Sequence, residues 1–405
     1  MNIKNKLLTF AGILIATTSG VSVAQEQLVS SAMKRYQDMW QSKNPADNEF
    51  YSSFNYQKAK GLPYEEGVSR RDPSQIIKVD DTYYVYYTKT EKGPAPVGYA
   101  KANPKTNTPA NTWDLASIYY ATSKDTYNWS EQGKAVGLGP KGEFDDRSVF
   151  TPGVLLWQGK YYLYYQAVQS PFNQRTKNVI AMSWSDSPNG PWHRHPEPVL
   201  TTGKSGVWDG DAAIRSKIKS EGGFDSLKVH DPYLLVKNGK IYMYYKAHPM
   251  GLAGKTQLSY PDFSGGLAIA ENPAGPFIKS KLNPVLNSGH EVVLWPYKTG
   301  IAALVTANGP EKNTIQWSED GENFEIMANV VLPPDAAGPY VPDAYTNTDN
   351  GVGITWGLSH VAQRKNKPWP HLIRFETSLT GNKERKFKRE NIRFTEEALL
   401  RSDKR

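Results

Sequence analysis

Three tyrosine-rich runs constrain the fold of this 405-residue chain more than any other feature. They span residues 83–87, 161–165 and 241–245, and each follows a short polar turn such as Gly159-Lys160. Aromatic and β-branched residues favour the pleated surface of a strand, whereas Gly, Asn and Asp favour the tight turn before it. The runs therefore predict antiparallel β-hairpins.

Each run belongs to a predicted unit of four strands. A short strand precedes the turn, and a third strand with a turn and then a Trp or Phe follows the run, before a weak fourth strand. Residues 300–305 and 351–356 are weaker copies of the run, and residues 344–346 and 373–379 are the predicted first and third strands of the last unit. Repeated four-stranded antiparallel sheets are typical of propellers. We therefore predict an all-β fold, a five-bladed β-propeller over residues 61–380, with a β-sandwich as the alternative.

The first 24 residues have the pattern of a secretory signal peptide. Lys4 and Lys6 precede an apolar stretch at residues 7–16, and Ser22-Val23-Ala24 supplies the small residues before the cleavage site. The apolar stretch is too short to cross a membrane. We expect an exported protein, periplasmic or secreted, without a membrane span; a buried N-terminal helix is the alternative.

Two terminal segments flank the predicted propeller. Residues 25–60 are predicted as an N-terminal helical segment, with a helix over residues 28–43 that buries little by itself and would dock on a larger surface, such as a second subunit of a homodimer. Residues 381–405 are predicted as a basic C-terminal extension, either solvated or at a dimer interface.

Composition excludes several classes of protein. The chain has no cysteine, which excludes a disulfide scaffold, a Cys-ligated zinc site and thiol catalysis. The net charge of +8 is a weak hint of an anionic partner. Because the aromatic residues lie in alternating runs and no helix-turn-helix or zinc-finger pattern occurs, we predict no nucleic-acid partner.

Acidic residues recur where the first strand of each predicted unit begins, which in a propeller faces the central channel. The segments are Arg71-Asp72-Pro73, Phe150-Thr151-Pro152, His230-Asp231-Pro232, His290-Glu291 and Pro342-Asp343. Mutual repulsion among such carboxylates raises the proton affinity of at least one, which separates a general acid from a general base. Two such groups are what glycoside hydrolysis requires. The alternative is structural, because Asp before Pro often caps backbone amides in turns.

Other residues could complete this site. Thr88, Gln166 and Lys246 directly follow the tyrosine-rich runs and are candidate channel residues. Trp113 and Trp208 lie in long loops and could stack on a sugar face, although each could equally be a packing anchor. No metal-binding motif occurs, and we predict no certain cofactor, but the clustered carboxylates could hold a hydrated divalent cation.

At these positions the sequence resembles glycoside hydrolase family 117. The resemblance rests on residues 67–74, Asn111-Thr112-Trp113, residues 229–233, Ser288-Gly289-His290-Glu291 and the N-terminal residues 31–35, and it covers about residues 28–400. It implies a five-bladed propeller and a homodimer with exchanged N-terminal helices. It also implies an exo-acting, inverting hydrolase that removes 3,6-anhydro-L-galactose from neoagarobiose and short neoagarooligosaccharides.

The resemblance also implies roles for individual residues. Asp72 would be the general base, His290 the general acid, and Asp231 and Glu291 would orient these groups and tune their proton affinities. The sugar-holding positions would be Trp113, Thr151, Gln166 and His230, and Arg71, Trp208 and Lys246 are further candidates from the pattern itself. Whether His290 or Glu291 donates the proton stays open. The rival hypotheses are a three-carboxylate propeller glycosidase of the arabinan type, with Glu291 as the acid, and a non-catalytic sugar-binding propeller.

Overall fold

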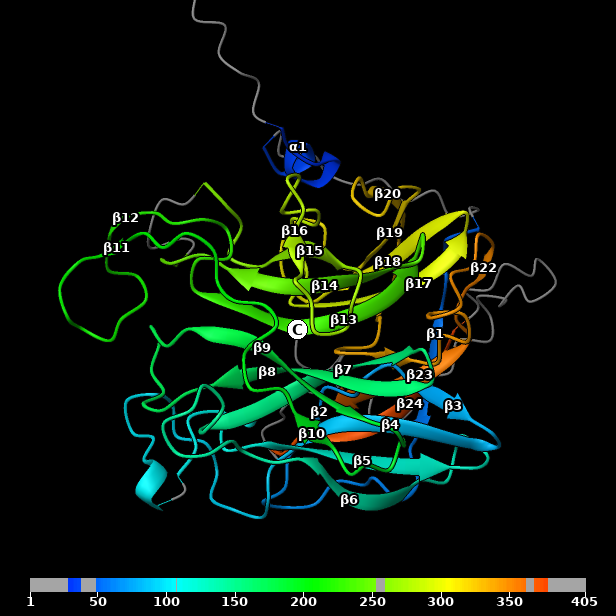
Figure 1. The fold of residues 1–405 in the computed structure, drawn as a ribbon, viewed down its shortest axis with the longest axis horizontal. Helices are drawn as coiled ribbons and strands as arrows, with labels where there is room; N and C mark the ends of the chain where they lie inside the picture. The colour runs from blue at the N-terminus through cyan, green and yellow to red at the C-terminus, as the bar shows by residue number, and fades with distance from the viewer. Residues whose placement is uncertain (1–27, 38–48, 107, 253–258, 362–367, 378–405) are drawn as a thin grey trace, which may run out of the picture.

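The computed structural model describes residues 28–37, 49–106, 108–252, 259–361 and 368–377, and these residues form an all-β fold (Figure 1). The two described helices are short: α1 (Ser31–Gln37) and the 3-10 helix η1 (Pro104–Thr106). The predicted signal peptide (1–24) and the basic extension (381–405) lie outside the described residues, as does part of the segment 25–60.

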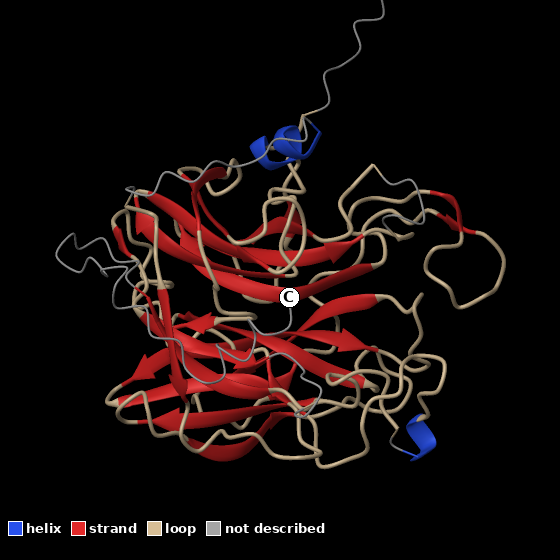
Figure 2. Cartoon of the chain, turned by 180° about the vertical axis from the view of Figure 1, so that it is seen from behind, coloured by secondary structure: helices blue, strands red, loops and turns tan. Residues whose placement is uncertain are grey.

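In the described residues, antiparallel pairing gives five groups of four or five strands, which we number 1 to 5 in chain order, and one separate two-stranded hairpin. The strands are drawn in Figures 1 and 2. Group 1 contains β2 (Arg70–Arg71), β3 (Ile77–Val79), β4 (Thr82–Lys89), β5 (Ser117–Ser123) and β6 (Ser130–Val136). Group 2 contains β7 (Ser148–Trp157), β8 (Lys160–Val168), β9 (Asn178–Ser185) and β10 (His193–Arg194). Group 3 contains β13 (Lys228–Lys237), β14 (Lys240–His248), β15 (Ser264–Ala270) and β16 (Ile278–Lys279).

Groups 2 and 3 join through one parallel pair between β9 and β13, and a hairpin of β11 (Val207–Trp208) and β12 (Ile218–Ser220) stands between them in the chain. Group 4 contains β17 (Glu291–Lys298), β18 (Gly300–Thr306), β19 (Thr314–Ser318) and β20 (Glu325–Asn329), with β22 (Gly351–Val352) paired to β17. Group 5 contains β21 (Gly338–Pro339), β23 (Trp356–Val361), β24 (His371–Thr377) and β1 (Phe54–Lys58).

Group 5 differs from the sequence prediction. The predicted second strand at residues 351–356 is wrong, because β22 pairs with group 4 and the actual second strand is β23. The predicted first strand at 344–346 is not a strand either; β21 takes that place. Strand β1 pairs with β24 along its whole length, so the sheets begin before residue 61 and include part of the segment predicted as helical. A strand from the start of the chain cannot be recognised as the partner of one at its end from local pattern alone.

The tyrosine-rich strands β4, β8 and β14 are buried on both faces because they lie between neighbouring groups. One hydroxyl from each strand reaches the next group along the chain. Tyr86 donates to the carbonyl of Pro188 at 2.6 Å, Tyr164 to that of Pro273 at 2.7 Å, and Tyr244 to that of Gly321 at 2.8 Å. The repeated tyrosine therefore supplies both apolar area and one hydrogen bond per junction.

The innermost strands approach one another closely. A Cβ at Gly153 of group 2 would lie 2.3 Å from the carbonyl oxygen of Pro232 in group 3, and a Cβ at Gly338 of group 5 would lie 1.9 Å from that of Ser74 in group 1. Only glycine permits such contacts. The strand ends that carry the predicted site residues are thereby held around one centre.

Helix α1 docks on groups 3 and 4 through polar contacts. The Ser30 hydroxyl accepts the amide of Met33 at 3.3 Å, as an N-cap does, and donates to the carbonyl of Pro284 at 2.5 Å. Arg35 forms a buried ion pair with Glu311 at 2.8 Å. Specific contacts therefore hold this helix against groups 3 and 4 of its own chain.

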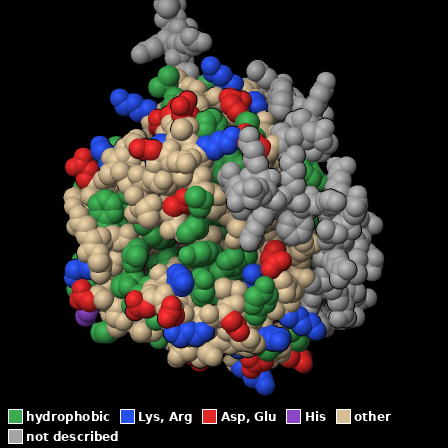
Figure 3. Space-filling model, turned by 90° about the vertical axis from the view of Figure 1, so that its right-hand side faces the viewer, with side chains coloured by type: hydrophobic (Ala, Val, Ile, Leu, Met, Phe, Trp, Pro, Cys, Tyr) green, Lys and Arg blue, Asp and Glu red, His purple; other side chains and the backbone are tan. Residues whose placement is uncertain are grey.

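The described surface is mixed in charge, and positive and negative side chains are interspersed on the face in Figure 3. Among the described residues, the helices are too short and too polar to span a bilayer.

Candidate active site

Three residues with strained backbone bring the site together. Asp72, Thr151 and Asp231 have φ of +49°, +48° and +51°, and each precedes a proline. The strand register shifts at the last two of these positions, in β7 and β13. A positive φ is unfavourable for a side chain with a Cβ and is found where a site requires it. The recurrence in groups 1, 2 and 3 places three polar side chains at equivalent points.

These residues meet group 4 in one small cavity. It measures about 30 Å³, room for about one or two water molecules, and its lining includes Asp72, Thr151, Asp231 and Glu291. Group 5 contributes Ala336 and Ala337 to this cavity, not the acid expected from its sequence. That acid, Asp343, instead accepts the amide of Val352 at 2.9 Å in a turn.

Asp72 is held as a carboxylate by Arg71. The Arg71 Nε donates to Asp72 Oδ2 at 2.8 Å, and the hydroxyls of Thr88 and Thr151 donate to the same oxygen at 3.3 Å. Burial by itself would raise the pKa of Asp72, but Arg71 together with His360 outweighs burial and holds the pKa well below its usual range. Asp72 Oδ1 lies 3.3 Å from His360 Nδ1, the atom that accepts the Asp72 amide, and it accepts no hydrogen bond from the described residues, so it can accept one from water.

Asp231 has its own cation in Lys246. The two side chains form a short ion pair, and Lys246 Nζ also donates to the backbone carbonyl of His290 at 2.7 Å. Burial opposes ionisation of Asp231, but Lys246 and then His230 outweigh it and lower its pKa far below normal. Burial also opposes the charge on Lys246, but Asp231 and Glu291 keep its pKa above normal.

Glu291 has the opposite protonation state. Burial raises its pKa to about 8; Lys246 opposes this rise, while Asp231 and Asp72 add to it. Glu291 is therefore largely protonated at neutral pH. Its Oε1 lies 3.7 Å from His290 Nε2. Lys246, followed by burial, lowers the pKa of His290 to about 2, so this imidazole is neutral.

Three predicted sugar-holding residues lie around this centre. The Thr151 hydroxyl donates to Asp72 Oδ2, and its backbone amide donates to the Thr88 hydroxyl at 2.7 Å. Gln166 is buried, and its Oε1 lies 3.2 Å from His230 Nδ1. Trp113 stacks on Phe150, the neighbour of Thr151, with ring centroids 4.7 Å apart. The structure therefore brings all three to the neighbourhood of the carboxylates.

Trp208 is placed differently. It lies on the β11–β12 hairpin, and the Arg175 guanidinium covers its ring at 4.4 Å. Trp208 does not line the cavity that contains Asp72, Asp231 and Glu291, so the structure does not show it beside these carboxyl groups. The long loop that suggested sugar stacking instead holds this tryptophan by a cation–π contact.

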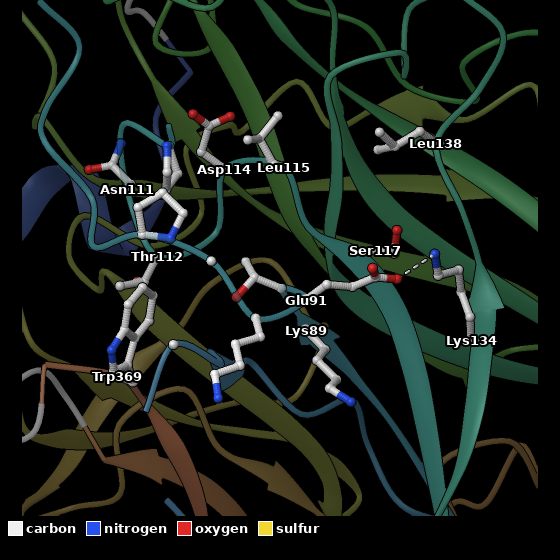
Figure 4. A pocket seen from close by; sticks show the side chains of 16 residues that line it. Lys89, Glu91, Asn111, Thr112, Asp114, Leu115, Ser117, Lys134, Leu138 and Trp369 are labelled. Carbon is white, nitrogen blue, oxygen red and sulfur yellow. Dashed lines mark hydrogen bonds and ion pairs between the residues drawn. The ribbon is translucent and has the colours of Figure 1, made fainter. Parts of the chain in front are cut away.

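A larger cavity of about 470 Å³ lies beside Arg71 (Figure 4). Its lining includes Lys89, Thr112, Lys134 and Trp369. Thr112 connects this cavity to the site because its hydroxyl accepts a hydrogen bond from Arg71 Nη1 at 2.8 Å. Asp72, Asp231 and Glu291 are not among its lining residues, so the larger cavity is not the one that contains the clustered carboxyl groups.

His360 was not predicted as a site residue from the sequence. This residue is buried at the end of β23, and its Nδ1 accepts the amide of Asp72 at 3.3 Å. It takes the place in group 5 that Thr88, Gln166 and Lys246 take at the ends of β4, β8 and β14. The position of His360 near the end of the second strand of its group could have identified it. It was not recognised because the second strand of group 5 was predicted at residues 351–356 and not at β23.

The site does not fit the divalent cation considered from sequence. Asp72 and Asp231 already have Arg71 and Lys246 as partners, and Glu291 is largely protonated. In the described part of the chain, no three His, Asp or Glu side chains are grouped to hold a metal ion.

Comparisons with known proteins agree with a glycosidase site. A model of glycosyl hydrolases family 43 matches residues 67–217. Among solved structures, Zg3597, "a family 117 glycoside hydrolase, produced by the marine bacterium Zobellia galactanivorans", is 39% identical, with a TM-score of 0.70, over 82% of this chain and 92% of that one. A search of curated proteins gave no significant match.

More distant structures share the fold alone. One described as a glycoside hydrolase is 14% identical with a TM-score of 0.54, over 90% of this chain and 97% of that one. A family 43 β-xylosidase/α-arabinofuranosidase from a compost microbial metagenome is 15% identical with a TM-score of 0.50, over 78% of this chain and 94% of that one. The all-β fold is that of the propeller glycoside hydrolases.

Proposed function

The chain belongs to glycoside hydrolase family 117, and from this premise we propose an exo-acting, inverting enzyme that releases terminal α-1,3-linked 3,6-anhydro-L-galactose from neoagarobiose and short neoagarooligosaccharides. The motifs at residues 67–74, 111–113, 229–233 and 288–291 support this substrate. The observation that carries the chemistry is the pairing of an ionised Asp72 with a protonated Glu291 in one cavity.

Asp72 acts as the general base. Arg71 and the two threonine hydroxyls fix Oδ2, which leaves Oδ1 to accept a proton from water. That water attacks the anomeric carbon as the bond to the leaving oxygen breaks, and the configuration inverts. Asp231 cannot supply the acid because Lys246 keeps it ionised, but its charge helps to keep the proton on Glu291.

Glu291 and His290 together act as the acid. Glu291 holds the proton, while the His290 side chain is 41% exposed against 13% for Glu291 and so is the more accessible group. The neutral imidazole accepts the proton from Glu291 at Nε2 and donates its Nδ1 proton to the leaving oxygen. Phe263 stacks on the ring at 4.7 Å and fixes its plane. The 3.7 Å gap closes when substrate binds, as catalytic hydrogen bonds commonly do.

The remaining parts of the proposal concern assembly and location. The five antiparallel groups are interpreted as the five blades of the propeller, with β1 completing the last blade. A homodimer would form through the N-terminal segment that contains α1, and residues 1–24 would direct export to the periplasm or medium. These statements rest on the sequence pattern and the family resemblance.

Product analysis tests the function. Neoagarobiose should give 3,6-anhydro-L-galactose and galactose, with the inverted anomer seen first by NMR, whereas neocarrabiose should remain intact. Cleavage of arabinan fragments in place of neoagarobiose would favour the three-carboxylate alternative, as would full activity of His290→Gln. Binding of sugar without turnover of any of these substrates would leave the non-catalytic propeller.

A further inference from the structure

On group 3, polar residues extend along strands β13 and β14 beyond His230, Asp231 and Lys246. Strands β13 and β14 pair antiparallel, with His230 opposite Lys246 and Lys228 opposite His248 (Figure 1). Residues directly opposite one another, and residues two apart on one strand, share a face of the sheet. Lys228 and His248 therefore form a second cross-strand pair, called here the second rung, on the face that carries His230 and Lys246.

This second rung holds a cation without a carboxylate partner. Asp231 is engaged by Lys246, and Asp262 is engaged by Arg215. Lys228 Nζ makes no ion pair or hydrogen bond with the residues that the structure describes. Burial, followed by the like charges of Arg215 and Lys246, lowers the pKa of Lys228 to about 8. A lone ammonium in such a place is stabilised by a bound anion.

Unsatisfied polar atoms cluster at the same rung. His230 Nε2, His248 Nδ1 and Arg215 Nε are buried and have no hydrogen bond within the described part of the chain. The two imidazoles stack at 4.8 Å, and His248 Nδ1 lies 3.9 Å from Asp262 Oδ1, the oxygen that Arg215 engages. Burying an unpaired polar group typically costs about 1–3 kcal/mol, so three in one cluster indicate that a polar ligand is expected there.

We propose that Lys228 and Arg215 form an anion-accepting subsite for a sugar that carries a sulfate ester or a carboxylate. The Lys228 ammonium and Arg215 Nε donate to the anionic group, and His230 Nε2 accepts a hydroxyl of the same sugar unit. This inference rests on the proposed function and deepens it. It makes charged sugars, bound beside the carboxylates, part of the substrate range.

Direct binding tests the subsite without relying on turnover. The full chain is titrated calorimetrically with methyl galactoside 6-sulfate, methyl galacturonate and neutral methyl galactoside, and with sodium sulfate at constant ionic strength. We expect at least one anionic sugar to bind more tightly than the neutral one. Lys228→Gln should lower the affinity for that ligand by about tenfold, which corresponds to the loss of one charged contact of about 1.4 kcal/mol. Lys228→Arg should retain the affinity within about threefold.

Lys240→Gln is the matched control. It removes one positive charge from the opposite, exposed end of β14, and should leave anion binding unchanged. Preference for the sulfated sugar identifies an ester, and preference for the galacturonate identifies a carboxylate. Equal binding of charged and neutral sugars by the wild type, or equal anion affinity in Lys228→Gln, overturns the proposal. Because this readout needs no hydrolysis, failure of the proposed reaction would be seen separately, as absence of products from neoagarobiose.

Discussion

The Asp72 side and the Glu291 side of the site contain the same functional group in opposite protonation states. Asp72 lies beside the Arg71 guanidinium, which holds the pKa of its carboxyl low. Glu291 is also largely buried, with a side chain 13% exposed against 3% for Asp72, but the cation that opposes its raised pKa, Lys246, is engaged by Asp231. Three carboxyl groups thus share two cations. The difference teaches that burial raises the pKa of both carboxyl groups, and that the allocation of cations decides which of them stays ionised and which keeps a proton.

Removing either the ionised carboxylate of Asp72 or the protonated carboxyl group of Glu291 should have the largest effect on kcat. Asp72→Asn abolishes the acceptor for the water proton, and Glu291→Gln abolishes the transferable proton, so each should lower kcat by about 10²–10⁴-fold. Rates on neoagarobiose, measured by anhydrogalactose release, check this prediction. Circular dichroism and thermal unfolding serve as controls for folding. Near-wild-type turnover in either variant would remove that residue from the mechanism.

Removing the shared cation should change both stability and rate. Lys246→Met leaves the largely buried Asp231 carboxylate without its cation, which should cost about 3–5 kcal/mol of unfolding free energy, measured by urea denaturation. It should also lower kcat/KM, because Asp231 then competes with Glu291 for the proton. The matched variant Lys240→Met loses only an exposed pair with Glu271 and should cost no more than about 1 kcal/mol.

A double variant makes this second prediction sharper. Lys246→Met combined with Asp231→Asn removes the uncompensated charge and should recover part of the stability lost in the single variant. If the two single effects simply add, the ion pair does not govern this side of the site.

The pH dependence should locate the proton. Because Glu291 holds the transferred proton in the proposed mechanism, kcat/KM should fall as pH rises through about 8. Asp231→Asn removes a like charge and frees Lys246, so the alkaline limb should move to lower pH. His290→Gln should lower the rate without moving that limb. A limb that shifts in His290→Gln but not in Asp231→Asn would assign the titration to the imidazole.

Much of the fold and site could be predicted from local pattern. The runs at 83–87, 161–165 and 241–245 gave the right strands because aromatic alternation after a turn is a local signal. Asp72, Asp231 and Glu291 were predicted as site residues because each lies at the start of a recognisable repeat unit, and the structure brings all three to one cavity.

What could not be predicted depends on long-range pairing or on charge balance. The partnership of β1 with β24 joins opposite ends of the chain, and the shift of the last unit hid His360. The spacing of Lys246 and Asp231 in the sequence does not reveal that they pair, so the raised pKa of Glu291 could not be deduced. Trp208 looked like Trp113 in sequence, and only packing distinguishes them.

The smallest effect expected concerns stability against pH. The pKa of Glu291 is about 8 in the folded chain against 4.5 for an ordinary Glu, so the native state keeps a proton that the unfolded state releases. Stability therefore falls as pH rises through this window, and Glu291→Gln removes that loss. The stability of the variant relative to wild type should increase by on the order of 2 kcal/mol between pH 6 and pH 7.5. Urea denaturation at both pH values measures it, with the exposed Glu319→Gln as control. If the difference in unfolding free energy between variant and wild type is the same at both pH values, Glu291 is ionised in the folded protein. Asp72 and Glu291 would then have the same protonation state.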